Sequence, residues 1–432
     1  MRQINNVVVG EKISAPSAAD CLRERAACVE VAAAMNCAEV RAHAKRRKCK
    51  GVALSSRQFW RQPANAAVLR FGDWAPLSYV IGVCLGVIAS AMILAPAALG
   101  EPMPVRFAQP LKVMFVGSHA AGMVVAVVDG EQTYFAGFGT ARANADVLPD
   151  ERSLLRINSI SKAMTGEILA GLIAERRIAL GMPLQAFAPT GRVVPRYRQA
   201  RAITLRDIVI HTSGLKRDLP SSLAQISRDE RWDWLDRTRP LRAPGRVAQY
   251  SNAAYMFLGD AMARATGEDF ATLLASHVTV PLNLRDTTLA PTPEQCGRLM
   301  TNGRDDHPCA PTRETAASAG VYSTAADMAR WMRATLERPP SPLVKRRELQ
   351  RLIGMDMAGR TDAIGMGWLH MRLGKTAVIQ KTGGGGGFMN YVVLAPSRRQ
   401  GIFVTVTRTD IEMLRRLTHE TNALLSELGD GR

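Results

Sequence analysis

The sequence predicts an α/β (α+β) fold: an antiparallel β-sheet flanked by helices, with a mostly helical lobe inserted in the middle. The chain has 432 residues, of which 47% are hydrophobic and 22% charged, so it can bury a large core. After residue 104, apolar β-prone runs lie at both ends of the sequence and helical patterns lie between them. Strands at both ends with helices between them imply an antiparallel sheet that is covered by helices, with the helical lobe inserted in the middle.

The first strands are expected in a hairpin. Residues 123–128 and 133–139 are apolar runs separated by an Asp-Gly turn signal. Residues 153–158 form a short third strand candidate, and residues 159–174 show apolar positions at helical spacing. The sequence therefore predicts a strand that leads directly into a helix at Ser159.

The middle of the chain is predicted to be helical and the last third to return to strands. The expected helices are 205–210, 253–266, 270–277 and 325–336. The expected strands are 377–380, 389–394 and 402–407, followed by a helix over 411–428. We expect the strand 402–407 to lie beside the strand that ends at Lys381.

The segment in front of this domain divides into two parts. Residues 74–100 hold no charged residue and are rich in Val, Ile, Leu, Ala and Gly, which is typical of a signal peptide or a membrane anchor. This predicts that the domain after residue 104 is periplasmic, secreted or anchored to the inner membrane. Residues 1–73 are interpreted as a disordered extension or as a start-site artefact, with the true start near Val68. A real cytoplasmic extension is the alternative.

The charge and the cysteines limit the partners. The net charge of +18 suits anionic surroundings, but no helix-turn-helix or zinc-finger pattern accompanies it, so we expect no nucleic acid. The cysteine spacing fits no zinc site, and no metal or cofactor is predicted. Cys296 and Cys309 would close a short loop, which predicts a disulfide in an oxidising compartment. Two unpaired thiols are the alternative.

The first chemical motif is a serine and a lysine on one face of a helix start. Ser159 precedes Lys162 by three residues, so both side chains point into one site. A lysine can take the proton of a serine hydroxyl when burial or other cations lower its pKa. Ser213 and Lys216 repeat the spacing, but a glycine between them indicates a loop, so we treat this copy as a decoy.

Two further motifs supply the other groups. Tyr250 and Asn252 stand at the start of a helical run, where a phenol between two ammonium groups can be held partly as phenolate and an amide can hold a carbonyl. Lys381, Thr382 and Gly383 end a β-prone run, which places a cation and a hydroxyl on a strand edge, and the glycine allows a close approach of substrate.

The order Ser-x-x-Lys, Tyr-x-Asn, Lys-Thr-Gly resembles the serine β-lactamase and penicillin-binding protein superfamily, and its middle tyrosine resembles the class C branch. The resemblance covers residues 105–428 and implies a β-lactamase/transpeptidase-like catalytic domain. Residues 293–300, 353–359 and 380–388 are also similar to the AmpH-type D-alanyl-D-alanine carboxypeptidase/endopeptidase subgroup.

The resemblance implies a role for each matched residue. Ser159 would form the acyl-enzyme, Lys162 and Tyr250 would move its proton, and Asn252 would hold the substrate amide. Lys381 and Thr382 would steer the substrate and tune the tyrosine.

The resemblance also implies an oxyanion hole formed by the backbone N–H groups of Ser159 and Gly384. Many class C enzymes have serine after Lys-Thr-Gly, whereas five glycines run here from Gly383 to Gly387. This departure puts efficient β-lactamase turnover in doubt.

Three functions remain open. The first is a serine D,D-peptidase that acts on peptidoglycan peptides as a carboxypeptidase, an endopeptidase or both, and that binds penicillin and other β-lactams. The second is a class C-like β-lactamase or small-ester hydrolase, and the third is a non-enzymatic β-lactam sensor.

Arg408 is a candidate for binding the substrate carboxylate, because it follows the strand 402–407. No Gly-x-Ser-x-Gly supports an α/β-hydrolase, and His211 has no acidic partner placed to orient it.

Overall fold

The computed structural model describes residues 103–142, 146–220, 227–301, 308–312, 315–337 and 361–430. The interpretations of residues 1–73 and 74–100, and the similarity at residues 353–359, lie outside these described residues. Within them, no helix has both the length and the apolar character that a membrane crossing requires.

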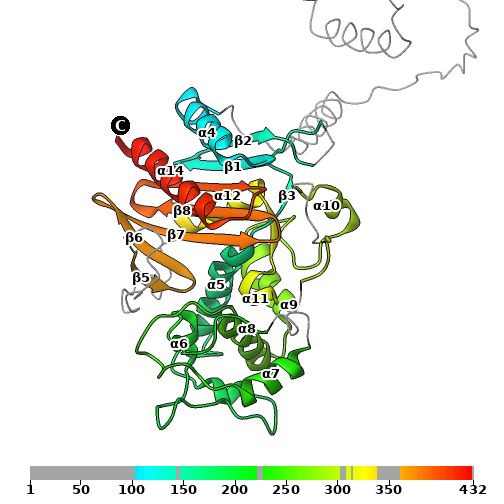
Figure 1. Ribbon diagram of the computed structural model, residues 1–432, viewed down its shortest axis with the longest axis vertical. Helices are drawn as coiled ribbons and strands as arrows, with labels where there is room; N and C mark the ends of the chain where they lie inside the picture. Colours follow the sequence, from blue (N-terminus) through cyan, green and yellow to red (C-terminus); the bar gives the residue numbers. More distant parts are fainter. Residues whose placement is uncertain are drawn as a thin grey trace, which may run out of the picture. The chain divides into compact units, whose positions relative to one another are not determined.

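The centre of the domain is a seven-stranded antiparallel sheet with the order β2-β1-β9-β8-β7-β6-β5 (Figure 1). Its strands are β1 (Gly122–Asp129), β2 (Gln132–Gly139), β5 (Thr361–Gly365), β6 (Trp368–Leu373), β7 (Thr376–Gly385), β8 (Phe388–Ala395) and β9 (Gln400–Val406). The sheet joins the two ends of the chain, because β9 pairs with β1 from Met123 opposite Val406 to Asp129 opposite Gln400.

Both faces of the sheet are buried. In β1, Val124, Ala126 and Val128 belong to one core, whereas the alternate residues Met123, Val125 and Val127 belong to the other. Successive strand residues point to opposite faces, so a continuous apolar run is the pattern of a strand with both faces covered.

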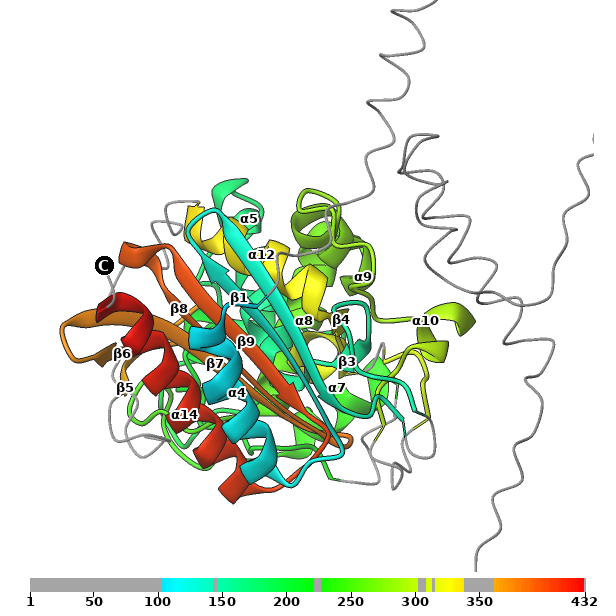
Figure 2. The same ribbon diagram turned by 90° about the horizontal axis from the view of Figure 1, so that it is seen from above.

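Each face is covered by helices. Helices α4 (Val105–Ser118) and α14 (Ile411–Asp430) lie on one face, and α12 (Ala325–Glu337) lies on the other (Figure 2). Helix α14 follows β9 directly and α4 precedes β1. The beginning and the end of the described chain therefore cover the same face.

A mostly helical lobe lies below the sheet in Figure 1. Its helices are α6 (Leu205–Val209), α7 (Arg228–Arg237), α8 (Asn252–Thr266), α9 (Phe270–Leu274) with the following π-helical turn Ala275–Thr279, and α11 (Ala316–Ala319). Helix α5 (Ser161–Ala174) connects the lobe to the sheet.

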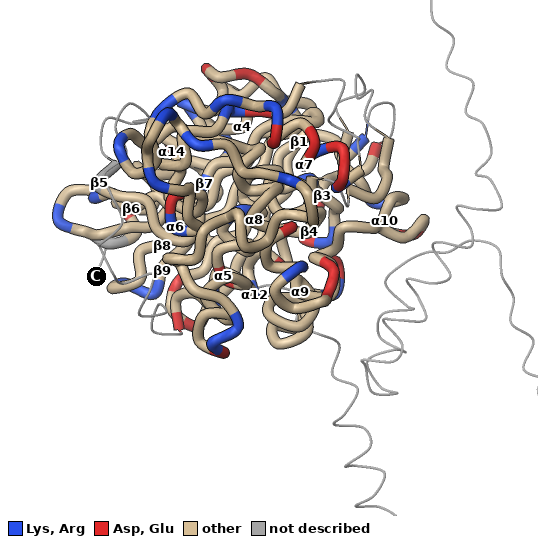
Figure 3. Tube along the Cα trace, turned by 90° about the horizontal axis from the view of Figure 1, so that it is seen from below, with Lys and Arg blue, Asp and Glu red and all other residues tan. Residues whose placement is uncertain are grey.

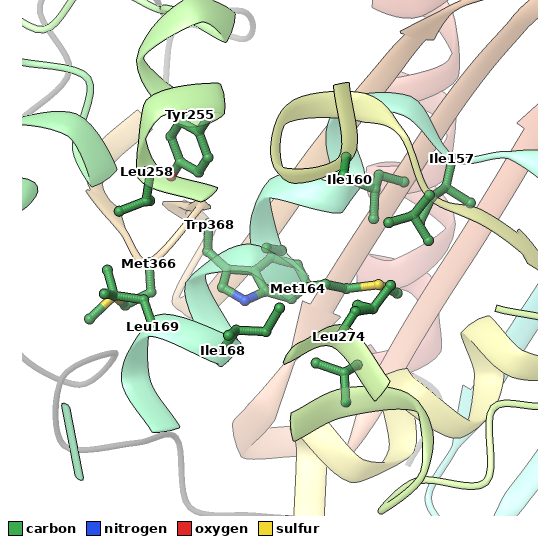
Figure 4. Close-up of a cluster of buried hydrophobic side chains, with 14 of the residues drawn as sticks. Ile157, Ile160, Met164, Ile168, Leu169, Tyr255, Leu258, Leu274, Met366 and Trp368 are labelled. Atoms are coloured by element: carbon green, nitrogen blue, oxygen red, sulfur yellow. The ribbon is translucent and has the colours of Figure 1, made fainter. Parts of the chain in front are cut away.

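Helix α5 is buried on almost every side, which explains why its apolar residues are not confined to one face. Met164, Ile168 and Leu169 are fully buried. Figure 4 shows them among side chains from several elements, including Leu258 of α8 and Trp368 of β6. The helix that carries the Ser-x-x-Lys motif is therefore fixed by packing along its length.

The predicted fold class and the main predicted elements are confirmed. The structure adds elements that the sequence pattern did not reveal, among them α4, α7, α11, the short strand β4 (Tyr322–Thr324), β5 and β6. Residues 153–158 form only the three-residue strand β3 (Leu154–Arg156), which pairs with β4 in a separate small sheet.

One predicted neighbour relation is wrong. The strand 402–407, observed as β9, does not lie beside the Lys381 strand β7, because β8 lies between them and pairs with both. The physical reason is that short connections join β7 to β8 and β8 to β9, and consecutive antiparallel strands with short connections become neighbours.

Candidate active site

Ser159 lies at the amino-terminal end of helix α5. The sequence predicted that the helix begins at Ser159, but Ser159 lies in a 3-10 turn, η2 (Asn158–Ile160), and the α-helix begins at Ser161. Lys162 follows in the first helical turn. The unpaired N–H groups of a helix start make this a favourable place for a serine that develops negative charge.

Tyr250 and Asn252 flank the start of α8. The side chain of Ser251 caps this helix by accepting a hydrogen bond from the Ala254 N–H at 2.9 Å. The cap fixes the direction in which the chain enters the helix. The same local signal that marks a helix start therefore also places the tyrosine and the asparagine on either side of the cap.

Ser159, Lys162 and Tyr250 are in contact. The Tyr250 hydroxyl donates a hydrogen bond to Ser159 Oγ at 2.8 Å, and Lys162 Nζ lies 3.4 Å from the same oxygen. Lys162 Nζ also donates to Asn252 Oδ1 at 2.7 Å and to the carbonyl oxygen of Ser318 at 2.6 Å. These bonds hold the amine beside the serine hydroxyl.

Lys381 completes the cluster from the sheet side. Its Nζ lies 5.1 Å from the centroid of the Tyr250 ring, and Lys162 Nζ lies 4.8 Å from that centroid. Two amines therefore face one phenol ring. The four predicted catalytic residues, Ser159, Lys162, Tyr250 and Lys381, are brought together, although they are up to 222 positions apart in the chain.

Burial sets the protonation of the amines. Burial, reinforced by the charge of Lys381, holds the pKa of Lys162 well below its usual value. Burial also lowers the pKa of Lys381 to about 7. An amine in such a site spends much of its time neutral near pH 7, and a neutral amine can accept the proton of a serine hydroxyl.

The surroundings of Tyr250 favour its neutral form over the partial phenolate that the sequence suggested. Burial raises the pKa of Tyr250 to about 12, and the hydrogen bond with Ser159 only partly opposes this rise. The physical reason is that moving the phenol out of water disfavours its anion more than the surrounding positive charge favours it. In the resting site Tyr250 is therefore a neutral donor, and the lysines are the groups that can accept a proton.

The end of β7 passes close to the nucleophile. A side-chain carbon added at Gly383 would lie 2.3 Å from the carbonyl oxygen of Ile157 and 3.2 Å from the backbone nitrogen of Ser159, so only glycine fits. The ladder between β6 and β7 ends where Leu369 pairs with Gln380. Beyond that pair, β8 is the only ladder partner of β7 among the described strands, and one edge of the strand faces the site.

The family described as Beta-lactamase matches residues 108–425. The chain belongs to the β-lactamase family. It is 38% identical to the D-alanyl-D-alanine-carboxypeptidase/endopeptidase AmpH of Escherichia coli K12 over 334 residues, which covers 73% of this chain and 86% of the relative. Family membership and the assembled serine site identify a serine hydrolase.

Solved structures of the family share the fold. The crystal structure of a β-lactamase/D-alanine carboxypeptidase from Yersinia pestis, complexed with citrate, is 37% identical, has a TM-score of 0.68 and covers 74% of this chain and 98% of its own. A class C β-lactamase from Rhodobacter sphaeroides is 21% identical, with a TM-score of 0.63 and coverage of 75% and 99%. The second comparison shows the fold alone.

The structure adds site residues of this β-lactamase-family enzyme that the motifs did not reveal. Asn252 Nδ2 donates to Asp218 Oδ1 at 2.5 Å, which turns the amide oxygen of Asn252 toward Lys162. The Arg217 guanidinium carbon lies 5.3 Å from the Tyr250 ring centroid. The only sequence signal for these two residues is a charged pair soon after a His-Thr-Ser-Gly turn, which is too common to single out.

The second Ser-x-x-Lys lies in a turn of the family fold, as predicted. The Ser213 hydroxyl accepts a hydrogen bond from the Leu215 N–H, and the Lys216 carbonyl accepts one from the Ser251 hydroxyl. His211 is buried nearby and its Nδ1 accepts a hydrogen bond from the Ser251 N–H. Burial, with the neighbouring cations, holds the pKa of His211 well below its usual value, so the imidazole is neutral.

Arg408 is not brought to this site. Its Nε donates to Asp410 Oδ2 at 2.5 Å and its Nη1 donates to the carbonyl oxygen of Ser118 at 2.7 Å. These bonds tie it to the end of α4 and to the segment before α14. The carboxylate-binding role was inferred from a strand pairing that the structure contradicts, and this correction removes its basis.

Cys296 and Cys309 are joined in the structure, with their Sγ atoms 2.05 Å apart. Cys296 lies in α10 (Pro293–Gly297), and Cys309 lies in the segment between α10 and α11. The pair therefore has the geometry that the predicted disulfide requires.

Proposed function

We propose that this enzyme is a serine D,D-peptidase that cleaves peptidoglycan peptides ending in D-alanyl-D-alanine, through an acyl-enzyme on Ser159, and that penicillin acylates the same serine. The observation that carries the proposal is the contact of the Ser159 hydroxyl with the Tyr250 phenol and with the low-pKa amine of Lys162. Similarity to the carboxypeptidase/endopeptidase AmpH supports the choice of substrate.

In the acylation step, Ser159 Oγ attacks the carbonyl carbon of the scissile amide while its proton passes to neutral Lys162. The Tyr250 phenol donates its proton to the leaving nitrogen, and the protonated lysine returns a proton to Tyr250. The C–N bond breaks as the C–O bond forms, and D-alanine leaves as a neutral amine. The contacts in the structure support this route, because both the amine and the phenol already lie against Ser159 Oγ.

The developing oxyanion is proposed to bind the backbone N–H groups of Ser159 and Gly384. The close approach of Gly383 to the Ser159 nitrogen supports this pairing, because it brings the end of β7 against the nucleophile's turn. Donors of this kind often supply the largest electrostatic contribution to acyl transfer. Water then attacks the ester, and the same groups move the proton in the reverse direction.

Substrate binding is assigned to the remaining motif residues. Asn252 would hold the substrate amide, while Lys381 and Thr382 would bind the terminal carboxylate. Beyond Gln380, no described strand pairs with this edge of β7, which supports binding of an extended peptide alongside the strand. For the location, we propose export through residues 74–100 and action on periplasmic peptidoglycan, with the cysteine pair as a second argument for an oxidising compartment.

A class C-like β-lactamase or small-ester hydrolase is the second candidate. The observation that favours it is the arrangement of Lys162, Tyr250 and Asn252, which would also accept a lactam. The two candidates differ in deacylation, because a D,D-peptidase releases the penicilloyl group slowly and a β-lactamase releases it rapidly.

The test is incubation of the purified full chain with muropeptides, followed by mass analysis. The expected products have lost one terminal D-alanine or one cross-link, and Ser159→Ala produces neither. Fluorescent penicillin should give an adduct on the peptide that contains Ser159 and not on the one that contains Ser213, with Ser213→Ala as the matched control. Unchanged muropeptides together with rapid release of penicilloate would reject the peptidase and favour the β-lactamase.

A further inference from the structure

The residue before the nucleophile has an unusual backbone conformation. Asn158 has a φ of 49°, which lies in the left-handed region, and it is 8% exposed. Glycine is the residue that adopts this region without cost, and asparagine is one of the few others that tolerate it. Glycine would be enough for the backbone of this turn. The side chain of Asn158 is therefore expected to have a role of its own.

The Asn158 amide connects two segments of the site. Its Nδ2 donates to the carbonyl oxygen of Arg156 at 3.0 Å, within its own turn, and to the carbonyl oxygen of Gly385 at 3.0 Å, at the end of β7. The second bond joins positions that are 227 residues apart in the chain. It attaches the turn that carries the nucleophile to the glycine run at the end of β7, which is called the glycine strand below.

The glycine strand needs such an attachment. Gly385, Gly386 and Gly387 have φ values of 140°, 52° and 83°, which are conformations that other residues rarely adopt. Glycines have no side chain that could pack and hold the backbone, and they have the largest conformational freedom to lose. The ladder with β8 holds one edge of β7 up to Gly385, and Asn158 holds the strand end from the side of the nucleophile.

Neighbouring bonds show that the attachment spans the whole strand end. Asn390 Nδ2 donates to the carbonyl oxygens of Arg156 at 3.0 Å and of Gly383 at 3.1 Å. Arg156 Nη1 donates to the carbonyl oxygen of Gly386 at 3.3 Å. Gly384 therefore lies between positions 383 and 385, both of which are bonded to side chains of the surrounding structure.

We infer that Asn158 is a positioning residue that holds the glycine strand end at a fixed distance from Ser159, so that the Ser159 and Gly384 N–H groups stay aimed at one oxyanion. The inference rests on the proposed function for the identity of these donors. It explains how this enzyme works with a glycine run where many class C enzymes have a serine: the side chain across the site adds to the β8 ladder in holding the strand end.

Two substitutions separate the side chain from the backbone. Asn158→Gly keeps the left-handed conformation and removes the amide, and Asn158→Asp keeps the size but has no N–H group to donate when ionised. Asn283→Gly is the matched control, because Asn283 is an exposed asparagine with a φ of 52° that no described contact links to the site. Each variant is made in the full chain and its active sites are counted by titration with fluorescent penicillin.

We expect kcat per titrated site to fall about tenfold or more in both Asn158 variants, with KM changed by less than about twofold. Complete loss of one oxyanion donor costs about 10²- to 10³-fold, and a misaligned donor costs less. The affinity for a boronic acid that forms a tetrahedral adduct with Ser159 should weaken in the same proportion as kcat/KM, because the adduct uses the same N–H groups. Asn283→Gly should match the wild type in all three measurements.

The inference is overturned if kcat per titrated site and boronate affinity of Asn158→Gly equal those of Asn283→Gly, whether or not the melting temperature falls. The rate of acylation by fluorescent penicillin separates this result from a failure of the proposed function. If the wild type releases no D-alanine, but penicillin acylates Asn158→Gly more slowly than the wild type, the peptidase is rejected and the inference is kept. If the wild type cleaves the peptide and Asn158→Gly cleaves it equally fast, the peptidase is kept and the inference is rejected.

Discussion

At the scale of single residues, burial decides the protonation of the site. Lys162, Lys381 and Tyr250 are all removed from water, and this desolvation lowers the pKa of both amines and raises that of the phenol. All three shifts favour the neutral form. The resting site therefore combines a proton acceptor and a proton donor around one serine, and no carboxylate among the described residues is hydrogen-bonded to Ser159.

The pKa of Lys381 predicts that a substrate with a free carboxylate and an uncharged ester depend differently on pH. Lys381 has a pKa of about 7 in the free enzyme, so its positive charge is lost as the pH rises above 7. A substrate with a free carboxylate then loses its counter-charge, and its kcat/KM should fall about tenfold per pH unit at higher pH. An uncharged ester does not need the cation and should keep a level kcat/KM in the same range.

Steady-state kinetics between pH 5 and 10 on one peptide and one ester measure the difference. Both substrates should lose rate toward acid pH, because protonation of Lys162 removes the acceptor for the Ser159 proton. Lys381→Ala should abolish the difference between the two substrates. If kcat/KM falls equally for the peptide and the ester above pH 7, Lys381 does not bind the carboxylate.

At the scale of elements, the connections of the sheet determine which residues reach the site. Strand β8 separates β7 from β9, and the end of β9 leads to Arg408 on the side of α4 and α14. Arg408 joins these two covering elements through Ser118 and Asp410. Its place in the fold is therefore that of a link between helices.

Replacing Arg408 with Ala should lower stability and leave substrate choice unchanged. The lost bonds are partly exposed, so the loss of unfolding free energy is expected to be only about 1 kcal/mol. Urea unfolding measures this loss, and the ratio of kcat/KM for a free-carboxylate peptide to that for an uncharged ester measures selectivity. A peptide-specific loss of about tenfold would restore a carboxylate-binding role.

The cysteine pair predicts a measurable contribution from a short loop. Cys296 and Cys309 are 13 positions apart, and closing a loop of this size stabilises a protein by about 3 kcal/mol in the chain-entropy description. Replacing both cysteines with Ser should therefore lower the unfolding free energy by about 2 to 3 kcal/mol. Alkylation of the exported wild type under denaturing, non-reducing conditions should leave both thiols unmodified. Reaction of both would show that the disulfide does not form.

At the scale of the whole molecule, the site is made where the sheet and the helical lobe meet. Lys381 comes from the sheet, Tyr250 from the lobe, and Ser159 from the turn that starts the connecting helix. Figure 3 shows Lys and Arg on many elements, from α4 and α14 to the β6–β7 turn. Such a distribution suits general attraction to anionic surroundings, since the field of many charges adds up over the surface.

Burying the site lysines should make stability rise with pH. In the unfolded chain Lys381 has an ordinary lysine pKa near 10.4, so between pH 7 and 10 the unfolded state binds more protons than the folded state. The unfolding free energy should then increase by up to about 1.4 kcal/mol per pH unit from this lysine alone. Above pH 10 the raised pKa of Tyr250 reverses the trend, because the unfolded tyrosine loses its proton first.

Urea unfolding of wild type and Lys381→Met at pH 7, 8 and 9 isolates this contribution. The difference between the two proteins reports Lys381 together with its effect on Lys162, whose pKa the charge of Lys381 helps to lower. The slope of the variant should be smaller by about 1 kcal/mol per pH unit. Parallel slopes would mean that Lys381 keeps its proton in the folded state.

The sequence by itself determined the fold class, the hairpin at β1 and β2, and the residues that assemble around the nucleophile. These features depend on local patterns: alternating or continuous apolar runs, an Asp-Gly turn, a helix cap before Asn252, and three short motifs whose order is specific. Even the decoy at Ser213 could be rejected locally, because glycine beside it indicates a turn.

Only the tertiary structure decided the rest. The order of the strands, and with it the place of Arg408, depends on which strands pair across the sheet. The contact of Asp218 with Asn252 and of Asn158 with Gly385 joins positions with no shared local pattern. The protonation of Lys162 and Tyr250 also depends on burial by distant segments, because desolvation is a property of the folded surroundings and not of the neighbouring residues in the chain.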